Sequence, residues 1–194
     1  AMIAYSSISH MGVVLLGVAA LNQAGLSGAL TQMVAHGLTA GLLFLLIGLL
    51  YERTHRRDLA AYGSLNRIAP RFAAFTVFAL LASVGLPGSA GFVAELQVLL
   101  AAYARWSGWL IFLSIGVLVS AAYALRAIRC LSTGAERGVV TREAGVAAFA
   151  DLTRSECAAA WLLSIGTVAI GFFPSPLLHV MAASLANLTR RFGV

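Results

Sequence analysis

The chain of 194 residues contains no lysine, and charged residues of all kinds make up only 10% of it. Hydrophobic residues account for 60% of the chain, and its mean hydropathy is +0.91. Soluble globular domains carry about 25% charged residues. The composition therefore excludes an ordinary soluble domain and places the chain among membrane proteins.

Cysteine is almost as scarce as charge. The two cysteines, Cys130 and Cys157, are too few to hold an iron–sulfur cluster, which takes about four thiolates. We interpret them as free thiols, with no disulfide framework and no metal site. The chain also lacks the glycine fingerprint of a nucleotide-binding site. We therefore expect neither a redox centre nor a cofactor-binding site within this chain.

The positive charges are 13 arginines, which give a formal net charge of +6. They lie between apolar segments and do not alternate with exposed aromatics, so nucleic acid is not an expected partner. Most of them occupy two connections, residues 51–71 and 126–156. Because positive charge marks cytoplasmic loops, we expect both connections in the cytoplasm and the C-terminus outside.

The apolar runs predict an all-α, polytopic transmembrane helix bundle. Each run is close to the roughly 20 residues that cross a bilayer core. We expect about five spans within one membrane domain. Pro174 and Pro176 should bend the outer end of the last span or make it re-entrant. The expected spans cover residues 2–21, 26–50, 72–103, 107–131 and 157–182.

The third expected span is discontinuous. Residues 85–91 (GLPGSAG) place three glycines and a proline, Gly85, Pro87, Gly88 and Gly91, inside an apolar run. Broken backbone at membrane depth is tolerated only where protein buries it or where it lines a wet cavity. We interpret this segment as a functional helix break, with a simple packing kink as the alternative.

Three ionisable residues share one depth. Glu95, His10 and His36 each lie about ten residues from the outer end of a different expected span, roughly 15 Å deep. A carboxylate at the membrane midplane is costly, and chains of Asp, Glu and His at that depth are typical of proton relays. Histidine suits this role because it titrates near physiological pH. We therefore predict a proton relay at Glu95, His36 and His10.

Other polar residues accompany the histidines at helical spacing. Ser6 lies four residues before His10, while Gln32 and Thr39 flank His36 at i−4 and i+3. These three residues are the expected supporting polar groups of the relay. The alternative is that they, and the histidines, only form hydrogen bonds that pack the helices.

The motifs together resemble a known family. Residues 4–12 (AYSSISHMG), 32–37 (QMVAHG), 51–58 (YERTHRRD) and 81–95 (LASVGLPGSAGFVAE) are similar to the M-type antiporter-like membrane subunits of respiratory complex I. So are residues 151–156 (DLTRSE) and 171–177 (GFFPSPL). The acidic Glu95 distinguishes the M type, because its sister subunits and cation/proton antiporters usually have lysine there. The sequence departs from the family at Ala94 and Leu96, where glycine and phenylalanine are usual, and near Arg126, where tryptophan is usual.

The resemblance implies fourteen helices with two inverted five-helix repeats, of which this chain would be a C-terminal fragment. It implies a proton-translocating subunit of NADH-quinone oxidoreductase in the bacterial inner (plasma) membrane. Glu95 would be the terminal carboxylate, near a half-channel that opens outward, and His10 and His36 would be the axial histidines. The partners would be other membrane subunits, including sister antiporter-like subunits. NADH, FMN, iron–sulfur clusters and quinone would be bound elsewhere in the complex.

Three alternatives remain at this point. A cation/proton antiporter would share the fold but exchange sodium without an electron donor, and it would favour lysine over Glu95. A membrane-bound hydrogenase with M-like subunits would use another electron donor. A structural membrane module would tolerate apolar residues at Glu95, His10 and His36.

Overall fold

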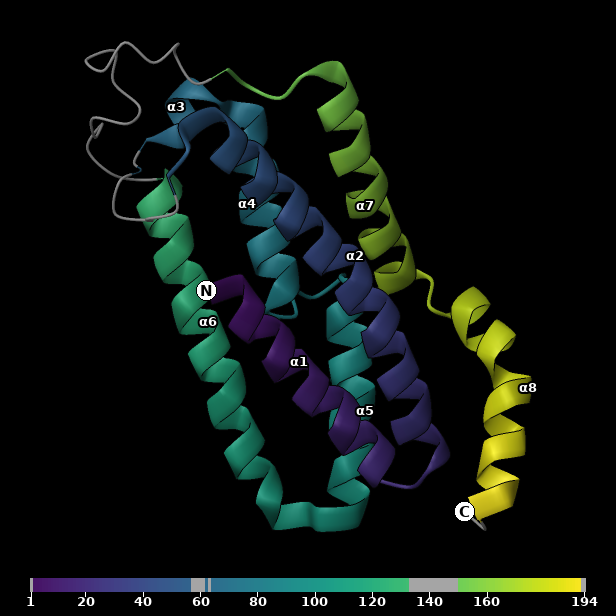
Figure 1. The fold of residues 1–194 in the computed structure, drawn as a ribbon. Coiled ribbons are helices and arrows are strands. Elements are labelled where there is room, and N and C mark those ends of the chain that lie inside the picture. Colours follow the sequence, from purple (N-terminus) through teal and green to yellow (C-terminus); the bar gives the residue numbers. More distant parts are fainter. Residues whose placement is uncertain (1, 57–61, 63, 133–149, 193–194) are drawn as a thin grey trace.

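The computed structural model describes residues 2–56, 62, 64–132 and 150–192, and every regular element in these ranges is helical (Figure 1). This confirms the predicted all-α helix bundle. In chain order the helices are α1 (Met2–Ala19), α2 (Gln23–Thr54), α3 (Leu65–Ile68), α4 (Pro70–Ser83), α5 (Ala90–Trp106), α6 (Leu110–Ser132), α7 (Arg154–Phe172) and α8 (Ser175–Phe192). A 3₁₀ turn, Ser107–Trp109, joins α5 to α6.

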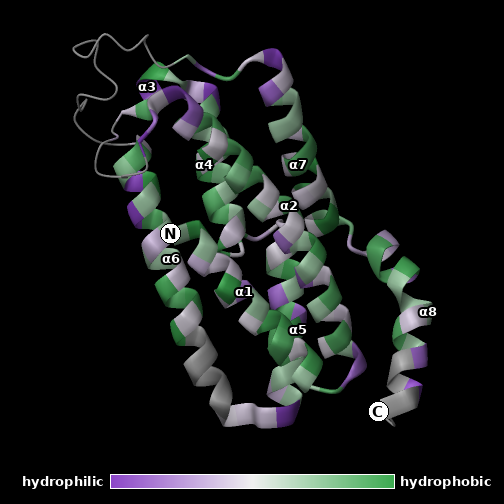
Figure 2. Ribbon diagram, in the orientation of Figure 1, coloured by the Kyte–Doolittle hydropathy of each residue, from purple (hydrophilic) through white to green (hydrophobic). Residues whose placement is uncertain are grey.

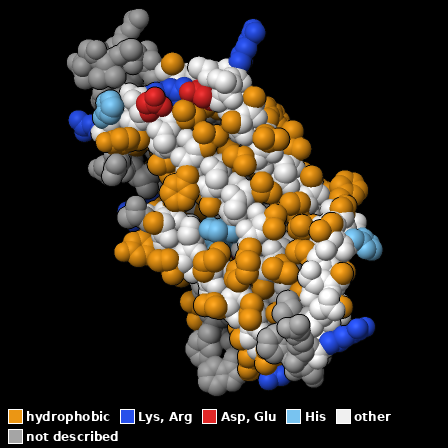
Figure 3. All heavy atoms as spheres, turned by 45° about the vertical axis from the view of Figure 1, so that its right-hand side comes forward, with side chains coloured by type: hydrophobic (Ala, Val, Ile, Leu, Met, Phe, Trp, Pro, Cys, Tyr) orange, Lys and Arg blue, Asp and Glu red, His pale blue; other side chains and the backbone are white. Residues whose placement is uncertain are grey.

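Four of the helices, α1, α2, α6 and α7, contain a segment long and apolar enough to cross a membrane. The helices α4 and α5 are shorter, because the segment between them divides one long apolar run. Hydrophobic residues dominate the middle of the bundle in Figure 2. In Figure 3 they cover the waist of the molecule, while charged side chains gather at its two ends.

The helix boundaries follow local capping. Asn22 begins α2 by accepting a hydrogen bond from the amide of Gly25 at 2.7 Å. Thr153 and Glu156 form a reciprocal capping box that begins α7. The bend expected from the two prolines is a complete break, since α7 ends at Phe172 and a separate helix, α8, begins at Ser175. Pro174 has no amide hydrogen with which to continue the ladder.

The long helix α2 is the centre of the bundle and contacts α1, α4, α5, α7 and α8. It packs closely on α5 at Gly28, where a Cβ would lie 2.9 Å from the backbone nitrogen of Val98 and 3.0 Å from the side chain of Gln97. In a bilayer, lipid is as apolar as the side chains, so close backbone packing of small residues is a main source of helix association. This packing brings the midsections of α1, α2 and α5 together.

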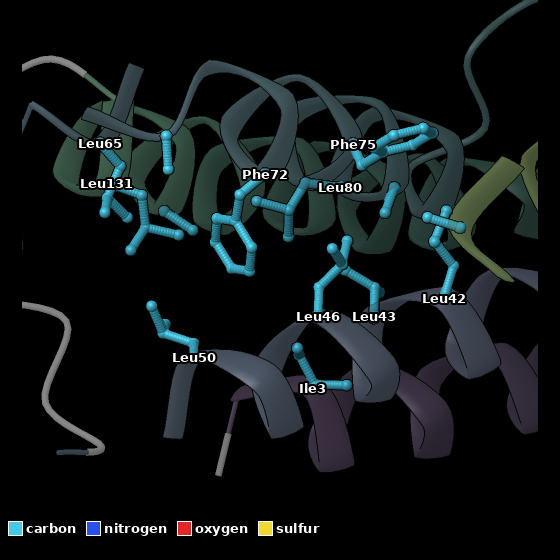
Figure 4. Packing of buried hydrophobic residues seen from close by; sticks show 14 of the residues in the cluster. Ile3, Leu42, Leu43, Leu46, Leu50, Leu65, Phe72, Phe75, Leu80 and Leu131 are labelled. Atoms are coloured by element: carbon cyan, nitrogen blue, oxygen red, sulfur yellow. The ribbon is translucent and has the colours of Figure 1, made fainter. Parts of the chain in front are cut away.

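Larger side chains fill a hydrophobic core in the other half of the bundle. Leu42, Leu46 and Leu50 of α2 pack toward Phe72 and Leu80 of α4 (Figure 4). This core lies beside the end of the molecule that carries Arg53, Arg56, Arg67, Arg71 and Arg154, which we call the arginine-rich end. Arg105 and Arg190 mark the opposite end.

Two contacts tie the arginine-rich end together. Arg53 of α2 forms an ion pair of 2.6 Å with Glu156 of α7. Asp151 accepts hydrogen bonds from the backbone amides of Arg71 at 3.2 Å and Phe72 at 3.0 Å, so it caps α4 from about 80 residues along the chain. The chain therefore fixes the start of the broken helix through long-range contacts as well as local ones.

Candidate functional site

His10 of α1 lies where three helices meet at the middle of the bundle. Only 9% of the residue is exposed. Its Nδ1 is 3.1 Å from Nε2 of Gln32 on α2 and 3.5 Å from Oε1 of Glu95 on α5. The structure thus brings together two predicted relay residues and one predicted supporting residue.

The remaining relay residue, His36 of α2, lies beside His10. The centroids of the two imidazole rings are 5.1 Å apart, and the ring planes are tilted by 39°. His36 is partly exposed, whereas Gln32, one turn earlier on the same helix, is only 1% exposed. The three ionisable groups therefore form a row across α2, α1 and α5, in the order His36, His10, Glu95.

The helix break lies close to Oε2, the other carboxylate oxygen of Glu95. Gly85 and Gly88 have φ angles of +86° and +91°, a region that glycine adopts without strain. A Cβ built on Gly85 would lie 2.8 Å from Oε2 of Glu95, so a side chain at this position would displace the carboxylate. Ser89 then begins α5 by accepting a weak hydrogen bond from the amide of Phe92 at 3.4 Å. The break therefore places its backbone directly against the carboxylate.

The other predicted supporting residues are buried but play a different part. The hydroxyl of Ser6 donates to the carbonyl of Ile3 within α1 at 2.8 Å. Thr39 is 5% exposed on α2. Among the described residues, no hydrogen bond joins either side chain to His10 or His36. Both side chains lie on buried faces of their helices, but burial alone did not decide which groups form hydrogen bonds with the histidines.

A cavity of about 150 Å³ adjoins His10 and Glu95. Ser9, Ser83 and Ser120, from α1, α4 and α6, are part of its wall, and most of the other lining residues are apolar. A cavity of this size has room for several water molecules, each of which needs two to four polar partners, and the three serines, His10 and Glu95 are the polar side chains that line it. These serines were not singled out from the sequence. Their only signal was position, since each lies within an apolar run near the midplane.

Gln32 can serve two charge states of His10. When Nδ1 of His10 is unprotonated, it accepts a hydrogen bond from the side-chain amide of Gln32. Oε1 of Gln32 is buried without a hydrogen-bond partner. A protonated Nδ1 could therefore donate to this oxygen once the amide turned over, or donate to Glu95. The cluster can thus hold a proton at more than one atom without leaving a charge unpaired.

Asp151 is the acidic group with the clearest electrostatic setting outside the membrane-spanning segments. Burial alone would raise its pKa, but hydrogen bonds from the amides of Phe72, Leu152 and Arg71, with the charge of Arg71, outweigh burial. The net effect lowers the pKa of Asp151 below its ordinary value of 3.8. The carboxylate is therefore held ionised at the amino terminus of α4, where the helix dipole favours negative charge.

Comparison with protein families gives a match over residues 1–120 to the family described as "NADH:quinone oxidoreductase/Mrp antiporter, TM". NADH-quinone oxidoreductase subunit M of Rhodobacter capsulatus is 38% identical over 191 residues, which is 98% of this chain and 36% of that protein. NAD(P)H-quinone oxidoreductase chain 4 1 of Synechococcus elongatus is 42% identical over 184 residues, or 89% of this chain and 32% of that protein. The chain thus spans about a third of the length of these relatives.

Solved structures agree with this assignment. A chain of respiratory complex I from Thermus thermophilus superposes with a TM-score of 0.83 and 36% identity, over 96% of this chain and 39% of that one. A chain of the Mrp complex from Dietzia shares the fold, with a TM-score of 0.78 and 22% identity over 96% of this chain and 42% of that one. The chain belongs to the NADH:quinone oxidoreductase/Mrp antiporter family of membrane subunits and is similar over nearly all its length to subunit M.

Proposed function

We propose that this chain carries the last part of a proton-translocation path in an NADH-quinone oxidoreductase. The observation that carries this proposal is the row of His36, His10 and Glu95 across three helices, which ends beside a helix break and a cavity that three serines help to line. Its relatives named as subunit M and chain 4 support the same complex. The driving reaction, quinone reduction by NADH, would take place in partner subunits that hold NADH, FMN, iron–sulfur clusters and quinone.

The proposed proton transfer runs along the row. A proton reaches His36, passes to the ring of His10 through a hydrogen-bonded water, and moves from Nδ1 of His10 to Oε1 of Glu95. The last two atoms are 3.5 Å apart, so a small approach completes a hydrogen bond. Because the groups are close, the charge state of each one changes the proton affinity of its neighbours. Glu95 then releases the proton through the cavity toward the outer side.

The proposal includes an orientation and partners. The arginine-rich end would face the cytoplasm, because positive charge is retained on that side. The protein would lie in the inner membrane beside sister antiporter-like subunits of the complex. The shared fold of the Mrp complex chain makes cation/proton exchange the main competing function.

The direct test replaces Glu95 with glutamine in the full-length subunit. The change keeps the shape of the side chain but removes its ability to ionise. We expect assembly and NADH oxidation to persist, while the number of protons taken up per NADH by inverted vesicles falls. Glu52→Gln is the matched control, because Glu52 is exposed at the arginine-rich end.

The outcomes separate the candidate functions. A normal proton ratio in Glu95→Gln would contradict the proposed relay and favour a structural module. Sodium-dependent proton exchange by wild-type vesicles without any electron donor would favour the antiporter. The relay stands if only the Glu95 variant loses proton uptake.

A further inference from the structure

Two helix breaks pack against each other at the middle of the molecule. The segment between α4 and α5 crosses behind α2 toward the end of α7, where α7 gives way to α8 (Figure 1). A Cβ built on Gly171, in the last turn of α7, would meet the carbonyl oxygen of Gly88 most closely, and would lie 2.6 Å from the carbonyl carbon of Gly88 and 2.7 Å from that of Ser89. Real Cβ atoms do not approach this closely, so the contact requires glycine at position 171.

The next residue of α7 contacts the same segment. A Cβ built on Gly88 would lie 3.1 Å from the ring of Phe172, which therefore covers that glycine. On its other side, the segment meets the carboxylate of Glu95 at Gly85. The break thus meets the end of α7 at Gly88 and Ser89, and the relay carboxylate at Gly85.

We propose that Gly171 is a positioning residue for Glu95, and that the end of α7 sets the distance between this carboxylate and His10. The inference rests on the proposed relay function of Glu95. A methyl group at position 171 would meet backbone atoms, which cannot turn aside as a side chain can. The distance from this methyl group to the carbonyl carbon of Gly88 would have to grow from 2.6 Å to about the 3.4 Å of ordinary contact, and that to the carbonyl oxygen by more, which moves the break and the carboxylate beside it.

The relay has little tolerance for such a shift. Nδ1 of His10 and Oε1 of Glu95 are 3.5 Å apart, already at the long limit of a hydrogen bond. A displacement of about 1 Å in a reacting pair can cost roughly a hundredfold in rate. The end of α7 therefore belongs to the transport machinery, although it contributes no ionisable group to the row.

The test compares Gly171→Ala with Gly166→Ala, both in the full-length subunit within the intact complex. Gly166 lies on the same helix, and a Cβ there would meet only the end of the Leu38 side chain at 3.4 Å. Assembly, NADH oxidation and protons taken up per NADH are measured for both. The infrared carboxyl band of Glu95, identified by its loss in Glu95→Gln, and the pH profile of proton uptake report on the carboxylate itself.

We expect Gly166→Ala to match the wild type. Gly171→Ala should lower the rate of proton uptake roughly tenfold or more, lower the number of protons taken up per NADH, shift the Glu95 band and displace the pH profile. A Gly171→Ala complex with an unshifted band and a normal ratio would overturn the proposal. If that variant fails to assemble, Phe172→Leu takes its place, because it frees Gly88 without adding atoms. An unshifted Glu95 band in Phe172→Leu would then be the contrary result.

The two proposals fail in different ways. Normal proton uptake in Glu95→Gln would contradict the proposed relay, whatever effect Gly171→Ala has on the infrared band. Loss of uptake in Glu95→Gln, with Gly171→Ala indistinguishable from Gly166→Ala, keeps the relay and removes the positioning role.

Discussion

At the scale of single residues, His10 is the group on which the site depends. Its Nδ1 faces both Gln32 and Glu95, so the same nitrogen can accept from an amide or donate to a carboxylate. His36 contacts His10 through the neighbouring faces of their imidazole rings. Of the three supporting polar residues expected from helical spacing, only Gln32 forms a hydrogen bond with a histidine within the described part of the chain, because a side chain must also point across the interface between helices.

The Gln32 contact leads to a prediction at this scale. Replacing Gln32 with leucine keeps the volume but removes the amide, so His10 loses its partner in the neutral state. We expect a stability loss of about 1 kcal/mol and a several-fold lower proton ratio, measured by thermal denaturation of the purified complex and by vesicle uptake. Thr31→Val is the control, because Thr31 is equally buried and its hydroxyl bonds only to the Ser27 carbonyl. Equal effects of the two variants on uptake would exclude a specific role for Gln32.

At the scale of elements, residues from later in the chain stabilise the broken helix at its start and at its break. Asp151 caps the start of α4, and Gly171 of α7 packs on the break before α5. Both contacts come from late in the chain, so α7 and its approach frame the helix that carries Glu95. A transmembrane helix with an interrupted ladder needs such partners for its freed backbone groups.

The Asp151 cap predicts a pH dependence of stability. The folded state lowers the pKa of this carboxyl, so its stabilisation is complete above the ordinary value of 3.8 and is lost as pH falls through the lower folded value. Asp151→Ala should cost about 1–2 kcal/mol at neutral pH. The free energy of unfolding of this variant should also fall less steeply with decreasing pH than that of the wild type. Thermal denaturation of the detergent-solubilised full-length subunit between neutral and acidic pH measures both effects. A variant as acid-sensitive as the wild type would show that other carboxyl groups control this transition.

At the scale of the whole molecule, charge and hydropathy define how the bundle sits in a membrane. A broad apolar surface separates the arginine-rich end from the opposite end (Figure 3). Exposed large hydrophobics such as Tyr5, Ile8 and Leu162 would be costly in water, so lipid or other protein must cover them. The chain matches about a third of the length of its relatives.

The orientation proposed above can be tested by labelling. In a full-length subunit with Cys130 and Cys157 replaced by serine, exposed Ser155 and Ser107 are changed to cysteine one at a time. A membrane-impermeant maleimide should modify Ser155→Cys in inverted vesicles and Ser107→Cys in right-side-out ones. The reverse pattern would place the arginine-rich end outside and contradict the charge rule.

The sequence by itself determined the class of fold, the membrane location and the three ionisable residues. These follow from composition, from the 3.6-residue helical period and from the cost of charge in a bilayer, all of which are local properties. The break at Gly85–Gly91 was equally visible, because glycine and proline act on their own backbone.

Only the tertiary structure decided which groups meet. Four features of the structure join residues that are distant in the sequence or lie on different helices. They are the hydrogen bond of Gln32, rather than Ser6 or Thr39, with His10, the serines of the cavity, the Asp151 cap and the packing of Gly171 on Gly88. Such contacts depend on how the helices rotate and cross, which is set by the packing of many side chains at once. No single stretch of sequence contains that information.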